Sequence, residues 1–89
     1  MNRVRFYIED PGSLEGQQEL YNMLSLWFEG YTLYRTDGFW EGVREDSMVI
    51  EVLGNYDKMK CDDFADRVKF IFDQDAVMYT REFVEATTR

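Results

Sequence analysis

The sequence predicts an α+β fold in which strands and helices follow the order β-α-β-β-α-β. Three observations predict it: alternating apolar residues near the start of the chain, two stripes of apolar residues at helical spacing, and a region rich in β-forming residues between those stripes. Two β-α-β crossovers joined by a hairpin give a four-stranded antiparallel sheet with both helices on one face, which is the ferredoxin-like arrangement. We expect the whole chain, residues 1–89, to form a single domain of this kind.

The first third of the chain predicts a strand and a helix. Apolar residues alternate with polar or aromatic ones over residues 3–9, which is typical of a half-buried strand. Ser13 then offers a side chain suited to capping a helix N-terminus, and apolar residues follow at helical spacing as far as Phe28. The pattern predicts a helix over 13–29 that ends before Gly30.

The middle of the chain predicts a β-hairpin. Residues 31–36 are rich in β-forming types, and Phe39 and Trp40 lengthen the same strand. Residues 42–46 are predicted to connect it to a third strand over 47–53, in which apolar residues alternate again.

The last third predicts a second helix and a final strand. Apolar residues from Cys61 to Phe72 recur with a period of 3.6 residues, which predicts a helix over 57–73. The alternation over 75–85 predicts the last strand.

The charge balance limits the classes of partner. Eighteen acidic and ten basic residues give a net charge of −8. A field of this sign repels nucleic-acid phosphate and anionic membrane surfaces, so we expect no direct nucleic-acid binding and no membrane docking. It favours a basic protein as partner, although negative charge also simply keeps a small protein soluble.

Several features predict a cytoplasmic protein. The one cysteine, Cys61, excludes an internal disulfide and fits a reducing compartment. The N-terminal residues lack the apolar run of a signal peptide, and no apolar run approaches the length of a membrane span.

The sequence offers no clear catalytic or metal-binding motif. It contains no histidine, the commonest general base and metal ligand. Cys61 belongs to the apolar stripe of the second helix and is better explained as a core residue than as a nucleophile. Asp62, Asp63 and Asp66 have the chemistry to hold a hard cation, but acids near a helix N-terminus more often offset its dipole. We therefore expect no catalytic residue, no metal and no cofactor.

One face of the predicted sheet has no helix to cover it. We expect the helix-facing set to be Val4, Phe6, Ile8, Met48, Ile50 and Val52. The residues expected on the open face are Arg5, Tyr7, Val49, Glu51 and Leu53, with Leu33, Arg35, Tyr79 and Arg81 from the outer strands. This mixture is more apolar than an ordinary solvated face, although folded surfaces are largely apolar in any case. It predicts a homo-oligomer in which two sheets pack face to face through Arg5, Tyr7, Val49, Glu51, Leu53 and Tyr79.

Aromatic and arginine side chains gather in the predicted hairpin. The candidate ligand- or partner-binding residues are Tyr31, Tyr34, Arg35, Phe39, Trp40 and Arg44. Aromatic residues and arginine are the usual anchors of protein interfaces. The same rings are also suited to stacking on a nucleotide-like ligand whose phosphate an arginine would hold. The opposing interpretation is that Trp40 folds back and caps the core.

Two segments in the second half of the chain resemble a pattern in small uncharacterised bacterial and phage proteins. They run from Glu45 to Val52 and from Phe72 through Gln74 to Val77. In those proteins a strand precedes a helix that closes on phenylalanine-x-glutamine and a final strand. The resemblance implies the fold and transfers no site residues.

Three functional hypotheses remain open. The leading one is a non-enzymatic, self-associating acidic binding protein that contacts a macromolecular partner, one version being a phage-type inhibitor whose carboxylates imitate the phosphates of DNA. The second is a small-ligand or nucleotide binder with a pocket at a subunit interface. The third is an enzyme built like the dimeric α/β barrels, with Glu51, Tyr7 or Tyr79 as acid or base.

Overall fold

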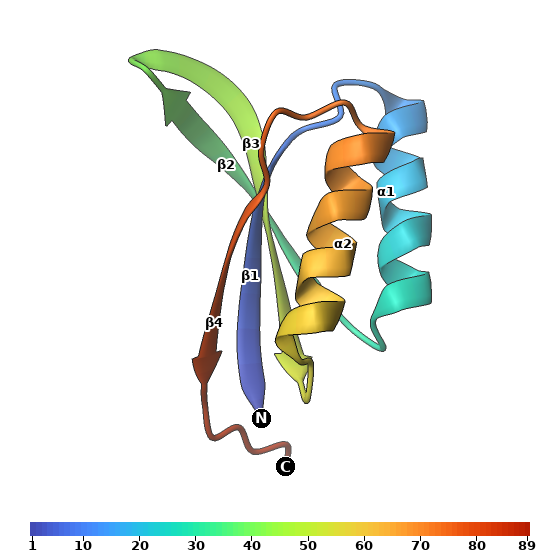
Figure 1. The fold of residues 1–89 in the computed structure, drawn as a ribbon, viewed down its shortest axis with the longest axis vertical. Coiled ribbons are helices and arrows are strands. Elements are labelled where there is room, and N and C mark those ends of the chain that lie inside the picture. The colour runs from blue at the N-terminus through green and yellow to red at the C-terminus, as the bar shows by residue number, and fades with distance from the viewer.

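The computed structural model describes residues 1–89. Its elements are β1 (Asn2–Glu9), α1 (Leu14–Trp27), β2 (Thr32–Trp40), β3 (Val43–Gly54), α2 (Lys58–Ile71) and β4 (Met78–Phe83). The strands pair antiparallel in the order β2-β3-β1-β4, and Figure 1 shows both helices on one side of this sheet. The predicted ferredoxin-like fold is confirmed.

The core fills the layer between the sheet and the helices. All six sheet residues predicted to face the helices are buried, and Phe6 packs its ring 4.8 Å from that of Phe64 on α2 and 5.9 Å from that of Phe28 after α1. Both helices begin at side-chain caps, since the Ser13 hydroxyl accepts from the Gly16 amide and the Asp57 carboxylate accepts from the Lys60 amide. Neither helix combines the length and the apolar content needed to cross a bilayer.

The β2–β3 hairpin is longer than the sequence pattern indicated. The predicted connection over 42–46 is wrong, because β3 already begins at Val43 and the turn consists of Glu41 and Gly42 alone. These two residues have φ of 50° and 79°, as a two-residue type I′ turn requires. A type I′ turn matches the right-handed twist of paired strands, so β2 and β3 stay paired right up to the turn.

The extra length produces a projecting arm, which we define as residues 37–46. β1 pairs with β3 only as far as Glu9 opposite Ser47, so beyond that point β3 pairs with β2 alone and the two strands form a ribbon. In Figure 1 the arm extends away from the helices.

β4 is shorter than predicted, starting at Met78 rather than at residue 75. The Gln74 side chain takes the place of a strand partner for the last residue of β1. Its amide oxygen accepts from the Glu9 N–H at 3.2 Å, and its amide nitrogen donates to the Glu9 carbonyl at 2.9 Å. A buried side-chain amide thus satisfies a backbone position that strand pairing would otherwise fill.

Candidate functional site

An apolar row crosses the open face of the sheet from one edge to the other. Tyr34 lies opposite Val49, Val49 opposite Tyr7, and Tyr7 opposite Met78, and none of the four points into the core. The outer two are well exposed, with 47% of Tyr34 and 61% of Met78 accessible, whereas Tyr7 and Val49 are half-buried. Facing side chains at such a spacing form one continuous surface.

A row of alternating charges lies beside the apolar row. Nε of Arg5 donates to Glu51 at 2.9 Å, and Nη2 of Arg3 lies 2.7 Å from a carboxylate oxygen of Glu82. The hydrogen bond to Glu51 raises the pKa of the Arg5 guanidinium above its ordinary value. Two cations and two anions cancel here, so this part of the surface is neutral in a chain of net charge −8.

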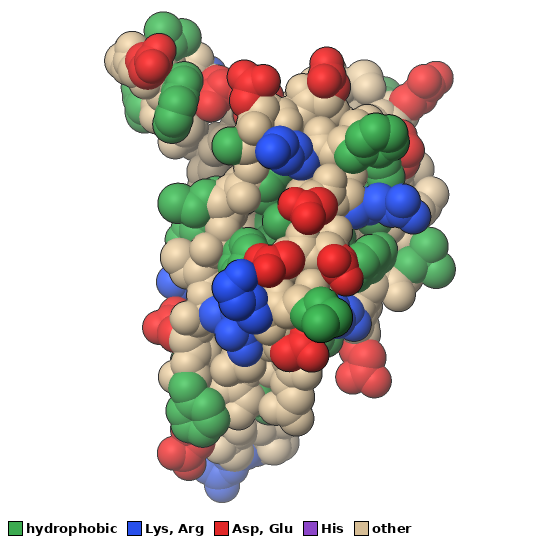
Figure 2. All heavy atoms as spheres, viewed as in Figure 1, with side chains coloured by type: hydrophobic (Ala, Val, Ile, Leu, Met, Phe, Trp, Pro, Cys, Tyr) green, Lys and Arg blue, Asp and Glu red, His purple; other side chains and the backbone are tan.

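A second apolar pair lies on the same side at the tip of the arm, separated from the apolar row by the pairs Thr36–Ser47 and Gly38–Glu45. Trp40 pairs with Val43, and the alternation along β2 places Trp40 on the same side as Tyr34. Trp40 is 70% and Val43 68% exposed, so Trp40 does not fold back onto the core. Figure 2 shows apolar side chains at the tip of the arm.

Both arginines predicted to hold a phosphate are already engaged. Arg35 donates to the Tyr21 hydroxyl at 2.7 Å and to Asp10 at 3.4 Å. Arg44 pairs with Asp37 and, at 2.9 Å, with Asp46, and these hydrogen bonds raise the pKa of its guanidinium.

The six predicted binding residues are therefore divided between two sides of the ribbon. Tyr34 and Trp40 face the open side, and Tyr31 packs against the core. Arg35, Phe39 and Arg44 lie on the other side of the ribbon, which is the side of the helices. The structure does not bring the six together in one pocket.

Four residues predicted on the open face instead lie on the helix side. Tyr79 stands opposite Phe6, and because Phe6 faces the core, Tyr79 does so too, with its ring 5.5 Å away. Arg81 pairs with Val4, Leu33 with Ile50 and Arg35 with Met48. Each partner faces the core, so Arg81, Leu33 and Arg35 also lie on the helix side of the sheet. The outward residues of β4 are Met78, Thr80 and Glu82.

The residues weighed as a nucleophile or as metal ligands form no reactive or metal-binding cluster. Cys61 is fully buried, and burial raises the pKa of its thiol, which disfavours the reactive thiolate. Asp62 accepts from Lys58 at 2.8 Å and also from the Tyr79 hydroxyl, and both contacts lower the pKa of its carboxyl. Asp62, Asp63 and Asp66 do not converge on a point where a metal ion would bind.

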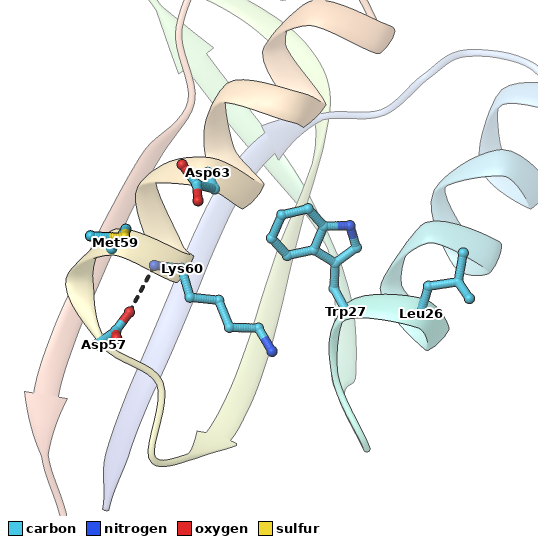
Figure 3. Close-up of a pocket in the computed structure, with 6 residues that line it drawn as sticks. All are labelled: Leu26, Trp27, Asp57, Met59, Lys60 and Asp63. Atoms are coloured by element: carbon cyan, nitrogen blue, oxygen red, sulfur yellow. Dashed lines mark hydrogen bonds between the residues drawn. The ribbon is translucent and has the colours of Figure 1, made fainter.

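A second surface, which sequence reasoning missed, lies along the seam between the two helices. A shallow depression of about 460 Å³ is lined by Leu26, Trp27, Asp57, Met59, Lys60 and Asp63 (Figure 3). A neighbouring depression shares Trp27 and Asp63 with it and continues to Asp66, Arg67 and Phe70. We call the two together the helix groove. In the sequence, the only indication of this groove is that apolar residues occur on the otherwise polar sides of the two helices.

The fold is shared by solved structures of low sequence identity. A DUF3240 family protein from Shewanella baltica superposes with a TM-score of 0.67 at 9% identity, covering 99% of this chain and 94% of that one. The periplasmic divalent cation tolerance protein CutA from Archaeoglobus fulgidus gives 0.58 at 15% identity over 100% and 89% of the two chains. A putative PII-like signaling protein from Thermus thermophilus gives 0.50 at 15% identity over 91% and 82%.

These similarities establish the fold alone, because all three identities are low. No protein-family model matches the sequence, and no curated protein sequence does. The predicted resemblance to small bacterial proteins is thus supported at the level of fold, and no family is assigned.

Proposed function

We propose that the protein is a non-enzymatic binding protein that self-associates through the open face of its sheet. The observation that carries the proposal is the apolar row from Tyr34 to Met78, which has no helix over it. Two such faces pack about 10 Å apart when sheets stack. The neutral row of arginines and glutamates beside it would meet its counterpart without adding net charge to the interface.

The arm extends this proposed interface. Trp40 and Val43 add a separate exposed apolar pair on the same side beyond the end of β1, and tryptophan is among the strongest anchors of protein interfaces. A signalling role, as in the name of the Thermus thermophilus neighbour, fits a small protein that contacts other molecules.

The test is the oligomeric state of matched variants. Native mass spectrometry and sedimentation should find an oligomer for the wild type and a monomer for Val49→Asp and Trp40→Asp, since a buried unpaired carboxylate is costly. Phe39→Asp is the control, because Phe39 is as exposed as Trp40 but lies on the opposite side of the arm. A monomeric wild type, or equal effects of the Trp40 and Phe39 variants, would contradict the proposal.

A small-ligand site at the subunit interface is the second candidate. Tyr34 and Trp40 share one side of the ribbon and would lie at the proposed interface. A nucleotide that raises the melting temperature of the wild type but not of Trp40→Asp would support it. Arg35 and Arg44 lie on the other side and bind carboxylates, so they add no support.

Neither DNA mimicry nor cation binding gains support from the residues of this chain. The carboxylates that would imitate DNA in a phage-type inhibitor include several already paired with arginine, such as Glu51 and Asp37. The cation tolerance named for the Archaeoglobus fulgidus neighbour finds no converging ligands here. A cytoplasmic location remains part of our proposal, and fractionation of the producing cells would test it.

A further inference from the structure

Exposed apolar side chains from both helices line the helix groove. Met59 is 73% and Phe70 84% exposed at its two ends, and Leu26 on α1 is 86% exposed. Half-buried Trp27 borders both depressions and thus lies at the centre of the groove. In Figure 3 its indole points from α1 towards α2. Apolar surface of this kind, rimmed by charges, marks interaction sites.

The charge around the groove is predominantly acidic. α1 carries Glu15 and Glu19 and no basic residue, and the chain has neither lysine nor arginine anywhere from Phe6 to Tyr34. On α2, Asp63 and Asp66 line the groove without an ion-pair partner within 4.0 Å.

Two cations also line the groove, Lys60 in the first depression and Arg67 in the second. Lys58 pairs with Asp62 at 2.8 Å, and the Lys60 ammonium lies over the Tyr56 ring, 4.9 Å from its centroid. Arg67 lies towards the Phe70 end of the groove. Asp63 borders both depressions, whereas Lys60 and Arg67 each border only one, so the middle of the groove offers a carboxylate to an incoming cation.

The length of the groove suits a short helix. Met59 and Phe70 are eleven residues apart on α2, about 16 Å or three turns at the rise of an α-helix. A third helix can lie along the seam of two packed helices, with 8–10 Å between axes. Apolar residues on one face of it would contact Met59, Trp27 and Phe70, while lysines or arginines beside that face would reach Asp63 and Asp66.

The geometry points to the helix groove as a docking site for a cationic amphipathic helix of a partner protein. This inference deepens the proposed binding function by naming the class of partner. The groove lies on the helix layer and the open face on the other side of the sheet, so an oligomer would keep its grooves accessible.

The test uses a synthetic helix of leucine and lysine, with a leucine–glutamate helix of the same pattern for comparison. In Trp40→Phe, Trp27 is the only tryptophan and reports on the groove directly. We expect the lysine peptide to shift Trp27 emission to shorter wavelength and the glutamate peptide to leave it unchanged. Asp63→Lys/Asp66→Lys should weaken binding at least about tenfold, the range for close charge pairs at an interface.

The matched control is Asp75→Lys/Glu85→Lys, which changes the net charge equally at exposed positions away from the groove. Equal weakening by both double variants would overturn the inference, because attraction would then depend on net charge alone. Unchanged Trp27 emission with the lysine peptide would overturn it as well.

Monomeric Val49→Asp separates this inference from the proposed self-association. If it still binds the lysine peptide, the groove acts without the oligomer and the inference holds. The opposite outcome is that Val49→Asp still forms oligomers and that Phe70→Ser abolishes oligomer formation. A second copy of the chain would then occupy the groove, and the inference fails.

Discussion

Tyr79 connects the edge strand β4 to the helix layer through two kinds of contact. Its ring packs against Phe6, and its hydroxyl donates to the Asp62 carboxylate on α2. Ionising the phenol would place two negative charges together, so the hydrogen bond raises the pKa of Tyr79 to about 12. Asp62 stays ionised beside Lys58, which lowers the pKa of its carboxyl.

The pH dependence of this contact can be predicted with its sign. Because the folded-state pKa is raised, the stabilisation is fully present below the pKa of a free tyrosine, about 10, and is lost as the pH rises through about 12. Phenolate absorbance of the wild type minus that of Tyr79→Phe isolates the Tyr79 titration from the other tyrosines. Asp62→Asn should return that titration towards its ordinary range, and a difference curve centred near pH 10 in the wild type would contradict the contact.

Single residues were predictable where one pattern determined their surroundings. Cys61 belongs to a long apolar stripe on α2, and its burial is confirmed. Tyr79 was placed on the wrong face because β4 is short and largely exposed, so its alternation of apolar and polar residues is weak. Its correct face follows only from its pairing with Phe6, which is a contact between distant parts of the chain.

At the scale of elements, the turn at Glu41 and Gly42 determines how far the arm projects. Both residues have positive φ, and a Cβ on Gly42 would meet nothing within 4 Å. The cost of a side chain there is therefore one of backbone conformation, without a steric clash against a neighbour. Glu41 is a poor residue for its position, since asparagine adopts the left-handed region more readily.

Two substitutions in the turn should change stability in opposite directions. Gly42→Ala should lower the free energy of unfolding by about 1 kcal/mol, and Glu41→Asn should raise it by a few tenths to about 1 kcal/mol. Urea denaturation measures both. Gly30→Ala is the control, because Gly30 also has open space around it but no positive φ. An equal loss for the Gly42 and Gly30 variants would show that the turn conformation is not the cause.

The order of the elements was predictable, but the ends of two strands were not. Helical and strand periodicities identify elements well, whereas the Glu41-Gly42 turn lacks the asparagine or aspartate that usually marks a type I′ turn. The start of β4 depends on the Gln74 side chain at Glu9, a tertiary contact that no local pattern predicts. Tyr34 and Arg35 are neighbours in β2, so their side chains point to opposite sides of the sheet. This follows from the alternation along a strand once β2 is known to run unbroken from Thr32 to Trp40.

At the scale of the whole molecule, the two proposed surfaces differ in electrostatic character. The open face has arginines and glutamates that cancel on one side of its apolar row and the neighbouring carboxylates of Glu9 and Glu45 on the other. The helix groove has aspartates without an ion-pair partner and lies beside a helix that has no basic residue. Each copy of the chain nevertheless carries a net charge of −8, so copies repel one another at long range.

Salt should therefore act on the two surfaces in opposite directions. Between about 0.01 M and about 0.1 M salt the Debye length falls from about 30 Å to about 10 Å, which screens the repulsion between acidic copies. Self-association of the wild type should strengthen over this range, because the repulsion between acidic copies falls while the apolar contact is little affected by salt. Binding of the leucine–lysine helix to monomeric Val49→Asp should weaken over the same range, because there the charges attract. Sedimentation of the wild type, and Trp27 fluorescence of Val49→Asp that also carries Trp40→Phe, measure the two equilibria at matched salt concentrations. Self-association that weakens with salt would mean that ion pairs between copies outweigh the apolar row, and the arginines and glutamates of the open face would then be its principal contacts.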